Sequence, residues 1–335
     1  MTRLITIALQ GDKYLDQYGG LAHMAEGYRF DGVSVYADLG FQPAIGPLLE
    51  VAAATRVLEL GPAALNPYLL HPVEIAGQMA LLNEASGGRA YLGLARGAWL
   101  DRLGIADDRP LLRMREAVAV IRHVLAGREE GFEGEIYRLP RGRLLKYEVF
   151  DPTIPVMIGA WGPKMLALAG EIADEVKVGG STNPDLVAEV RRRVAVGEER
   201  AGRPAGTVGI CFGAVTVVDE DGPRARAHVR REVARYLPVV APMDPTVDIP
   251  AATLREMQRL VDADRLDDAA ALVPDDTLDR FAFSGTPEEI VAQANGLFAA
   301  GVTRIEFGTP HGLTENGGLR LLGERVLPAL RTGGS

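Results

Sequence analysis

The sequence contains a single cysteine, Cys211, among 335 residues. One cysteine excludes intrachain disulfides and cysteine-cluster metal sites. Its neighbours in VGICFGAVTVV are apolar, which favours a buried core thiol over a reactive one. This use of cysteine fits a reducing compartment, and we expect a cytoplasmic protein.

The sequence also lacks an excess of basic residues. It carries 36 Lys and Arg against 45 Asp and Glu, a formal net charge of −9. Because nucleic acids and membrane surfaces are polyanions, we expect neither as a partner. No apolar run approaches the length of a membrane span.

Metal-binding and covalent-catalysis motifs are missing as well. The histidines are His23, His71, His123, His228 and His311. None pairs at a metal-ligand spacing, so we expect no metal site. No Gly-x-Ser-x-Gly or Walker sequence occurs, so hydrolase and nucleotide-triphosphatase functions lack their signals.

Short apolar runs alternate with longer helical patterns throughout the chain, which is 47% hydrophobic. The runs predict strands over residues 4–9, 32–37, 57–65, 89–95, 154–160, 174–180, 207–218 and 302–308. Near-continuous apolar strands separated by helices indicate a parallel sheet covered by helices. Eight such units predict one (β/α)8 TIM-barrel domain over residues 1–335.

Two segments interrupt the alternation. Residues 131–150, GFEGEIYRLPRGRLLKYEVF, predict an inserted strand pair. Residues 219–283 are rich in Ala, Asp and Arg and predict a helical insertion at the top of the barrel. Insertions of this length often form lids or subunit contacts.

The chemistry of such a barrel lies at the carboxyl ends of its strands. After the fifth predicted strand, Gly159 and Gly162 would let backbone N–H groups approach a ligand, and Pro163 opens a helix. A helix N-terminus preceded by glycines suits a phosphate, although the glycines could merely make a turn. Trp161 could flank a ring or cap the core.

Other strand ends carry further candidates, each with a structural alternative. Asp38 could orient a polar substrate or relay a proton, or it could cap a helix. Arg96, beside Gly97, could bind a phosphate or carboxylate, or form a salt bridge at the rim. The stretch Gly61–Tyr68 suggests either a bulge against a flat ligand or a short loop. His311, in FGTPHG, is the histidine expected over the barrel mouth.

Four stretches carry a resemblance to a known family: LGPAALNPY, LLNEASGGRAYLGLARG, IPVMIGAWGPKMLALAGEIADEVKVGGSTNP and GTPEEIVAQANGLFAAGVTRIEFGTP. Together they resemble the luciferase-like superfamily, in its branch that uses the deazaflavin coenzyme F420. Methylenetetrahydromethanopterin reductase typifies that branch. The resemblance spans nearly the whole chain.

The resemblance implies a deazaflavin ring in the barrel mouth and a cofactor tail and phosphate on the Gly159–Pro163 turn. It also implies a non-prolyl cis peptide at Ala63–Ala64. The cofactor-binding residues that it assigns are Ala63, Ala64, Asn66, Arg96, Gly97, Gly159, Ala160, Trp161, Gly162, Pro163 and Gly180. Asp38 or His311 would be the proton donor or substrate-orienting group.

The chain departs from the family where relatives carry acids or a histidine. Leu39, Ala8 and Ala98 stand at those positions. The cofactor side therefore looks retained, while the substrate side looks changed.

Three functions are compatible with these residues. The leading hypothesis is an F420-dependent oxidoreductase acting on a small organic acceptor, such as a methylene-tetrahydropterin-like compound, an imine or an enone. The second is an FMN-dependent luciferase-like monooxygenase. The third is a non-catalytic cofactor-binding protein. Relatives pair through helices on one side of the barrel, so we expect a homodimer.

Overall fold

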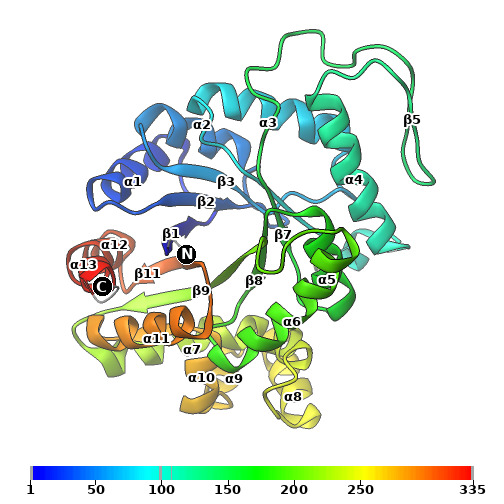
Figure 1. Ribbon diagram of the computed structural model, residues 1–335. Coiled ribbons are helices and arrows are strands. Elements are labelled where there is room, and N and C mark those ends of the chain that lie inside the picture. Colours follow the sequence, from blue (N-terminus) through cyan, green and yellow to red (C-terminus); the bar gives the residue numbers. More distant parts are fainter. Residues whose placement is uncertain (1–2, 98–99, 107, 333–335) are drawn as a thin grey trace.

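The computed structural model describes residues 3–97, 100–106 and 108–332. Its core is a ring of parallel strands surrounded by helices (Figure 1). The strands are β1 (Leu4–Leu9), β2 (Gly32–Tyr36), β3 (Glu59–Ala63), β4 (Leu92–Ala95), β7 (Val156–Gly159), β8 (Glu175–Gly179), β9 (Gly209–Val218) and β11 (Arg304–Gly312).

The strands pair in the order β3-β2-β1-β11-β9-β8-β7-β4. Two isolated parallel bridges, Leu60 with Ala90 and Leu65 with Leu94, join the first strand of this order to the last. The sheet therefore closes nearly completely, and the predicted (β/α)8 barrel is confirmed.

The barrel helices cover the outer face of the strands. They are α1 (Leu15–Gly27), α2 (Ile45–Ala54), α3 (Pro72–Ser86), α4 (Pro110–Leu125), α5 (Pro163–Ile172), α6 (Pro184–Arg200) and α11 (Pro287–Ala300). The chain ends through α12 (Glu315–Leu321), a π-helical turn (Leu322–Val326) and α13 (Leu327–Thr332). Five of these helices begin with proline, whose fixed φ suits the first helical position.

Apolar strands form the core because both of their faces are covered. Ile5, Ile7 and Leu9 of β1 are fully buried, as are Val33 and Val35 of β2. Burial of both faces explains why these runs are almost continuously apolar.

The inserted strand pair is shorter than expected. β5 (Phe132–Glu133) and β6 (Arg138–Leu139) pair antiparallel, and residues 140–155 lie in no helix or strand. The turn between them is held from outside, because the Glu116 carboxylate accepts the N–H groups of Glu135, Ile136 and Tyr137 at 2.8–3.0 Å. The segment extends away from the barrel beside α4 (Figure 1).

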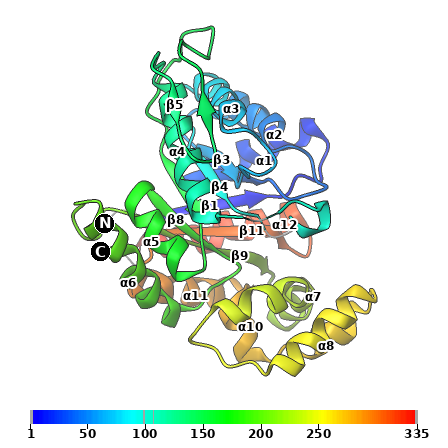
Figure 2. The same ribbon diagram turned by 90° about the vertical axis from the view of Figure 1, so that its right-hand side faces the viewer.

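The helical insertion consists of α7 (Gly222–Val240), α8 (Ala251–Asp262), α9 (Leu266–Ala271) and α10 (Asp275–Phe281). These helices lie together on one side of the barrel (Figure 2). They share a second apolar cluster that includes Val233, Met257 and Phe281. A short strand that was not predicted, β10 (Phe283–Gly285), follows them and pairs with β9.

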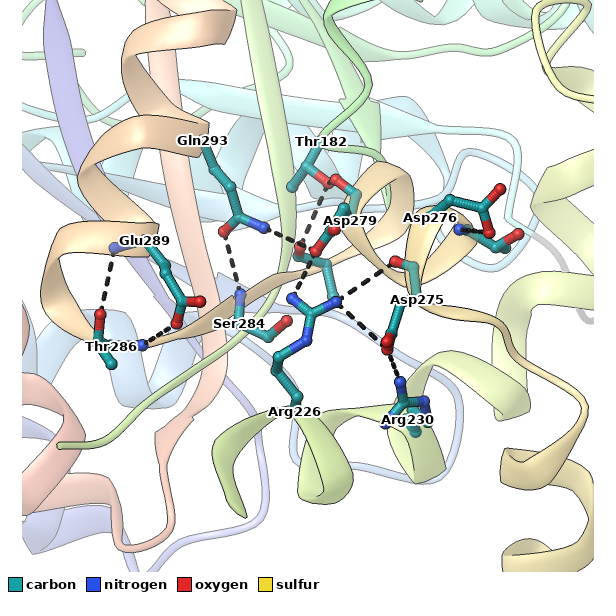
Figure 3. A network of polar contacts seen from close by, with 12 residues as sticks. Thr182, Arg226, Arg230, Asp275, Asp276, Asp279, Ser284, Thr286, Glu289 and Gln293 are labelled. Carbon is teal, nitrogen blue, oxygen red and sulfur yellow. Dashed lines mark hydrogen bonds and ion pairs between the residues drawn. The ribbon is translucent and has the colours of Figure 1, made fainter. Parts of the chain in front are cut away.

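A polar network fixes the insertion to the barrel (Figure 3). Arg226 of α7 donates to the Asp279 carboxylate of α10 at 2.6 Å, and Gln293 of α11 donates to the same carboxylate at 3.4 Å. Thr182, after β8, donates to the Asp279 backbone carbonyl at 2.9 Å. The insertion is therefore tied to two barrel elements.

In the described part of the chain, no helix combines the length and the apolar character that crossing a membrane requires.

Candidate functional site

A cavity of about 1070 Å³ opens at the carboxyl ends of the strands. Its walls come from the segments after β2, β3, β4, β7 and β8, and from the helical insertion. The predicted site residues that it brings together are Asp38, Ala63, Ala64, Asn66, Arg96, Gly97, Gly159, Ala160, Trp161, Gly162 and Pro163. Residues far apart in sequence thus meet at one site, as expected for this fold.

The turn after β7 places an uncapped helix end on the cavity. Gly162 is the N-cap of α5, and no side chain in the described part of the chain caps this helix end. By contrast, Asn183 caps α6 by accepting from the Asp185 N–H. The first-turn N–H groups of a helix lack internal partners and attract anions. The start of α5 is therefore suited to an anionic ligand.

Two glycines of this turn differ in their surroundings. A Cβ on Gly159 would lie 3.1 Å from the Cβ of Ala95, whereas a Cβ on Gly162 would meet nothing within 4 Å. Gly162 also has an ordinary φ of −72°. The fold itself does not require glycine at position 162, so the open space is available to a ligand.

Trp161 forms a fixed wall of the cavity. Its indole Nε1 donates to the Gly179 carbonyl at 2.9 Å, and the ring packs against both apolar clusters. The alternatives left open by the sequence are therefore not exclusive, because Trp161 joins the two cores and also lines the cavity.

The ends of β3 and β4 form one connected unit. The Ala63–Ala64 peptide is cis, as the family resemblance implied. The Asn66 side chain donates to the Arg96 carbonyl at 2.6 Å. Gly97 has a φ of +84°, and a Cβ there would fall 2.2 Å from the Asn66 amide nitrogen. Glycine is therefore required at position 97.

The charges around the cavity are mostly positive. Arg96, Arg109, Lys164 and Lys177 line it, and Asp38 is the single carboxylate among its described lining residues. Asp38 is exposed and accepts a hydrogen bond from Gln10 at 3.0 Å. This balance favours an anionic ligand.

Lys177 was not predicted from the sequence. It lies on β8, and its side chain is only 12% exposed. Its ammonium contacts the Glu306 carboxylate of β11, and Glu306 accepts a second hydrogen bond from the Ser34 hydroxyl at 2.5 Å. The available signal was the alternation of charged and apolar residues in EVKV and RIEF, which places charges inside a barrel.

His311 does not line the cavity, in contrast to the expected place over the barrel mouth. β11 continues as far as Gly312, so His311 still lies within the strand, and its side chain is fully buried. Its Nε2 lies 3.2 Å from the Phe307 carbonyl oxygen. Burial lowers the pKa of His311 to about 4, so the ring is neutral at physiological pH.

Gly180 is also absent from the cavity wall, where its neighbour Gly179 lies instead. A Cβ on Gly180 would lie 3.2 Å from the Tyr236 ring, so this glycine is needed for packing against α7. Among the departures from the family, Leu39 is exposed at the cavity and Ala8 is buried in β1. Ala98 lies outside the described residues.

Exposed apolar side chains gather at the cavity entrance. We call Leu39, Leu69, Leu103, Val239 and Met243 the apolar rim, since each is exposed and each lines the cavity. Exposed apolar residues that cluster in this way commonly mark a binding surface. Among the described residues, no group of three His, Cys, Asp or Glu side chains could hold a metal ion.

Comparisons with known proteins agree with this geometry. The luciferase-like monooxygenase family model matches residues 5–304. The 5,10-methylenetetrahydromethanopterin reductase of Archaeoglobus fulgidus is 34% identical over 295 residues, covering 85% of this chain and 86% of its own. An F420-dependent glucose-6-phosphate dehydrogenase of Nakamurella multipartita is 31% identical, covering 93% and 91%.

Solved structures give the same fold. The coenzyme F420-dependent tetrahydromethanopterin reductase of Methanopyrus kandleri superposes with a TM-score of 0.87 at 24% identity, covering 98% of this chain and 100% of that one. An F420-dependent secondary alcohol dehydrogenase, in complex with an F420-acetone adduct, superposes with a TM-score of 0.80 at 20% identity, covering 99% and 100%.

Proposed function

Because the chain belongs to the luciferase-like monooxygenase family, we propose that it is a coenzyme F420-dependent oxidoreductase acting on a small organic acceptor. Curated relatives over most of its length are an F420-dependent dehydrogenase and a methylenetetrahydromethanopterin reductase. The observation that carries the proposal is the uncapped N-terminus of α5, which opens on a mostly basic cavity.

The residues present fit an anionic, phosphate-bearing coenzyme. The space beside Gly162 admits a ligand close to the backbone, where the first turn of α5 offers a phosphate the Lys164 N–H. Pro163 has no N–H, and the Met165 N–H bonds the Gly162 carbonyl at 3.1 Å. Arg96, Arg109 and Lys164 place positive charge on the same walls. When bound, F420 supplies the hydride, and the protein supplies orientation and exclusion of water.

The apolar rim indicates which acceptor would enter beside the cofactor. An acceptor with an apolar, uncharged body would bury rim surface at about 25 cal/mol per Å². A polar phosphosugar would gain nothing from these side chains. Asp38, which is exposed at the same end, stays our predicted substrate-orienting group, whereas His311 lies too deep to touch an acceptor in the cavity.

The proposed assembly and location are a homodimer in the cytoplasm. The homodimer is proposed from the family resemblance, which implies pairing through helices on one side of the barrel. The single buried thiol, Cys211, is consistent with a reducing compartment.

A titration of the protein with F420 tests the proposal. The wild type should bind F420, and Gly162→Leu should weaken that binding at least 10-fold, because the new side chain fills the space proposed for the cofactor. Gly20→Leu is the matched control, since Gly20 also has no neighbour within 4 Å but lies exposed on α1. Full-strength F420 binding by Gly162→Leu would refute the proposed site.

Assays of the wild-type protein distinguish the proposed enzyme from the two alternative functions. An FMN-dependent monooxygenase should bind FMN in preference to F420 and consume oxygen when a flavin reductase is added. A non-catalytic cofactor-binding protein should bind F420 but oxidise none of its reduced form in the presence of imines, enones or methylene-pterins.

A further inference from the structure

One charged pair inside the barrel reaches the cavity. Lys177 lies at the cavity floor with its side chain 12% exposed, and its partner Glu306 is 1% exposed. A pair removed from water costs more in desolvation than an exposed pair, so such pairs are weak stabilising devices. Its presence directly beneath an open cavity therefore calls for a reason other than stability.

The register of the sheet explains how the two residues meet. Along the hydrogen-bonded rows, Lys177 is level with Cys211 of β9, and Cys211 is level with Arg304 of β11. In a closed eight-stranded barrel with a shear of eight, horizontal layers advance about one residue per strand. Two strands away, the residue at the same height as Lys177 is therefore Glu306, two positions beyond Arg304.

The partners of Lys177 leave part of its ammonium available. A lysine carries three N–H donors. One side of the ammonium contacts Glu306, and another lies over the Tyr36 ring, 5.3 Å from its centroid. Among the described residues no further hydrogen-bond or ion-pair partner of the ammonium is found, and Lys177 lines the cavity.

We propose that Lys177 is a catalytic residue that gives a proton to the acceptor, and that Glu306 is the positioning residue that holds it. This inference rests on the proposed oxidoreductase function. Ser34 fixes Glu306, so the carboxylate keeps the ammonium at one place on the cavity floor. Asp38, by comparison, is exposed and held only at the entrance.

The proton step balances the reaction. Bound reduced F420 would supply the two-electron reductant, and the acceptor carbon would gain a C–H bond. For an imine the π pair would move to nitrogen, and for an enone that takes the hydride at its β carbon the conjugated π electrons would move to the carbonyl oxygen. That atom takes a proton from Lys177 Nζ, and the neutral amine then recovers a proton from water at the open cavity.

The test uses Lys177→Ala with 2-cyclohexen-1-one and 1-pyrroline as probe acceptors. We expect F420 binding within about threefold of wild type and a kcat about 100-fold lower, the size of a lost general acid. Added ethylammonium should restore part of the rate, because it can occupy the vacated space beside Glu306. A structural role alone would not give this rescue.

A second variant is needed in case Lys177→Ala does not fold. Lys177→Ala leaves Glu306 buried without its cation, whereas Lys177→Met/Glu306→Gln removes both charges and should show the same loss of kcat without a loss of F420 binding. Glu175→Gln is the control, because Glu175 belongs to a separate ion cluster at the amino ends of the strands. Its kcat per folded molecule should equal that of the wild type.

The outcomes separate the two proposals. If the folded double variant keeps the wild-type kcat, Lys177 is not the proton donor, and the oxidoreductase function stands. If the wild type fails to bind F420, the proposed function and the role of Lys177 both fail. They also fail together if it binds F420 and reduces none of the imine, enone and methylene-pterin acceptors.

Discussion

The barrel contains two buried ion clusters built by the same pair of strands. β8 contributes Glu175 and Lys177, and β11 contributes Arg304 and Glu306. Side chains two positions apart on a strand share a face, so all four point into the barrel. The upper cluster joins Lys177 to Glu306, and the lower cluster joins Arg304 to Glu175.

The two clusters differ in what they can reach. Lys177 lines the cavity at the carboxyl ends of the strands. Arg304 lies at the amino ends, bonded to Glu175 at 2.9 Å and to Glu59 at 2.8 Å. In this barrel type the carboxyl ends carry the chemistry and the amino ends carry stability. We therefore expect the upper pair to take part in the chemistry and the lower pair to stabilise the fold.

The Arg304 guanidinium of the lower cluster stays protonated although it is buried. Burial alone would lower the pKa of Arg304, but attraction to Glu175 and Tyr91 raises it above its usual value. Burial raises the pKa of Glu175, and Arg304 opposes that shift. The arginine therefore stays charged, and removing its buried partner should be costly.

Removal of that partner gives the largest expected effect on stability. Glu175→Gln leaves the buried Arg304 guanidinium with Glu59 as its remaining carboxylate. We expect the free energy of unfolding to fall by about 3 kcal/mol, the low end for breaking a buried pair, because Glu59 remains. Urea denaturation measures it, alongside F420 titration.

The assignment of the lower cluster to stability is contradicted if Glu175→Gln lowers kcat and leaves the free energy of unfolding unchanged. A wild-type unfolding midpoint combined with a reduced kcat would place the lower cluster in the mechanism. Arg304→Met/Glu175→Gln serves as the companion variant, because it leaves no unpaired buried cation and should recover part of the lost stability.

Much of the fold was predictable because the strands are local features. β1 falls on the predicted residues 4–9, since an apolar run buried on both faces needs no distant partner to be recognised. The turn of Gly159 and Gly162 was predictable for a similar reason, because glycines and a proline mark a strand-to-helix turn in sequence.

The upper cluster could not be predicted because it depends on distant register. Lys177 and Glu306 are 129 positions apart, and they meet only when β8 and β11 are staggered by the barrel. His311 was misplaced for a related reason, since nothing local shows that β11 runs on to Gly312. The short length of the β5–β6 pair could not be predicted either. Glu116, on the separate helix α4, accepts hydrogen bonds from the N–H groups of the turn between these strands.

His311 is fully buried beside a carboxylate, Glu315, that already pairs with Lys13 at 3.1 Å. A Glu315 carboxylate oxygen lies 4.0 Å from its Nδ1. Burial lowers its folded pKa to about 4, against about 6.5 for an unfolded histidine, so the unfolded chain binds the proton more tightly. Stability from this group is complete above pH 6.5 and is lost as the pH falls towards 4.

At pH 4.5 the expected loss from His311 is about 2.5 kcal/mol relative to pH 7, and His311→Gln should lack that component. Urea denaturation of both proteins at the two pH values measures it, because carboxyl groups away from the ring titrate equally in each. Identical losses in wild type and variant would mean that His311 is protonated as readily folded as unfolded.

The smallest expected effect lies within the lower cluster itself. Glu59 bonds the same guanidinium as Glu175, yet its side chain is 46% exposed against 14% for Glu175. Water can replace an exposed carboxylate, so Glu59→Gln should lower the free energy of unfolding by less than about 1 kcal/mol. Added salt should reduce the difference further. A loss as large as that of Glu175→Gln would show that geometry, and not burial, sets the strength of the cluster. Burial of the carboxylate could then not be used to explain why an ion pair of this barrel is strong or weak.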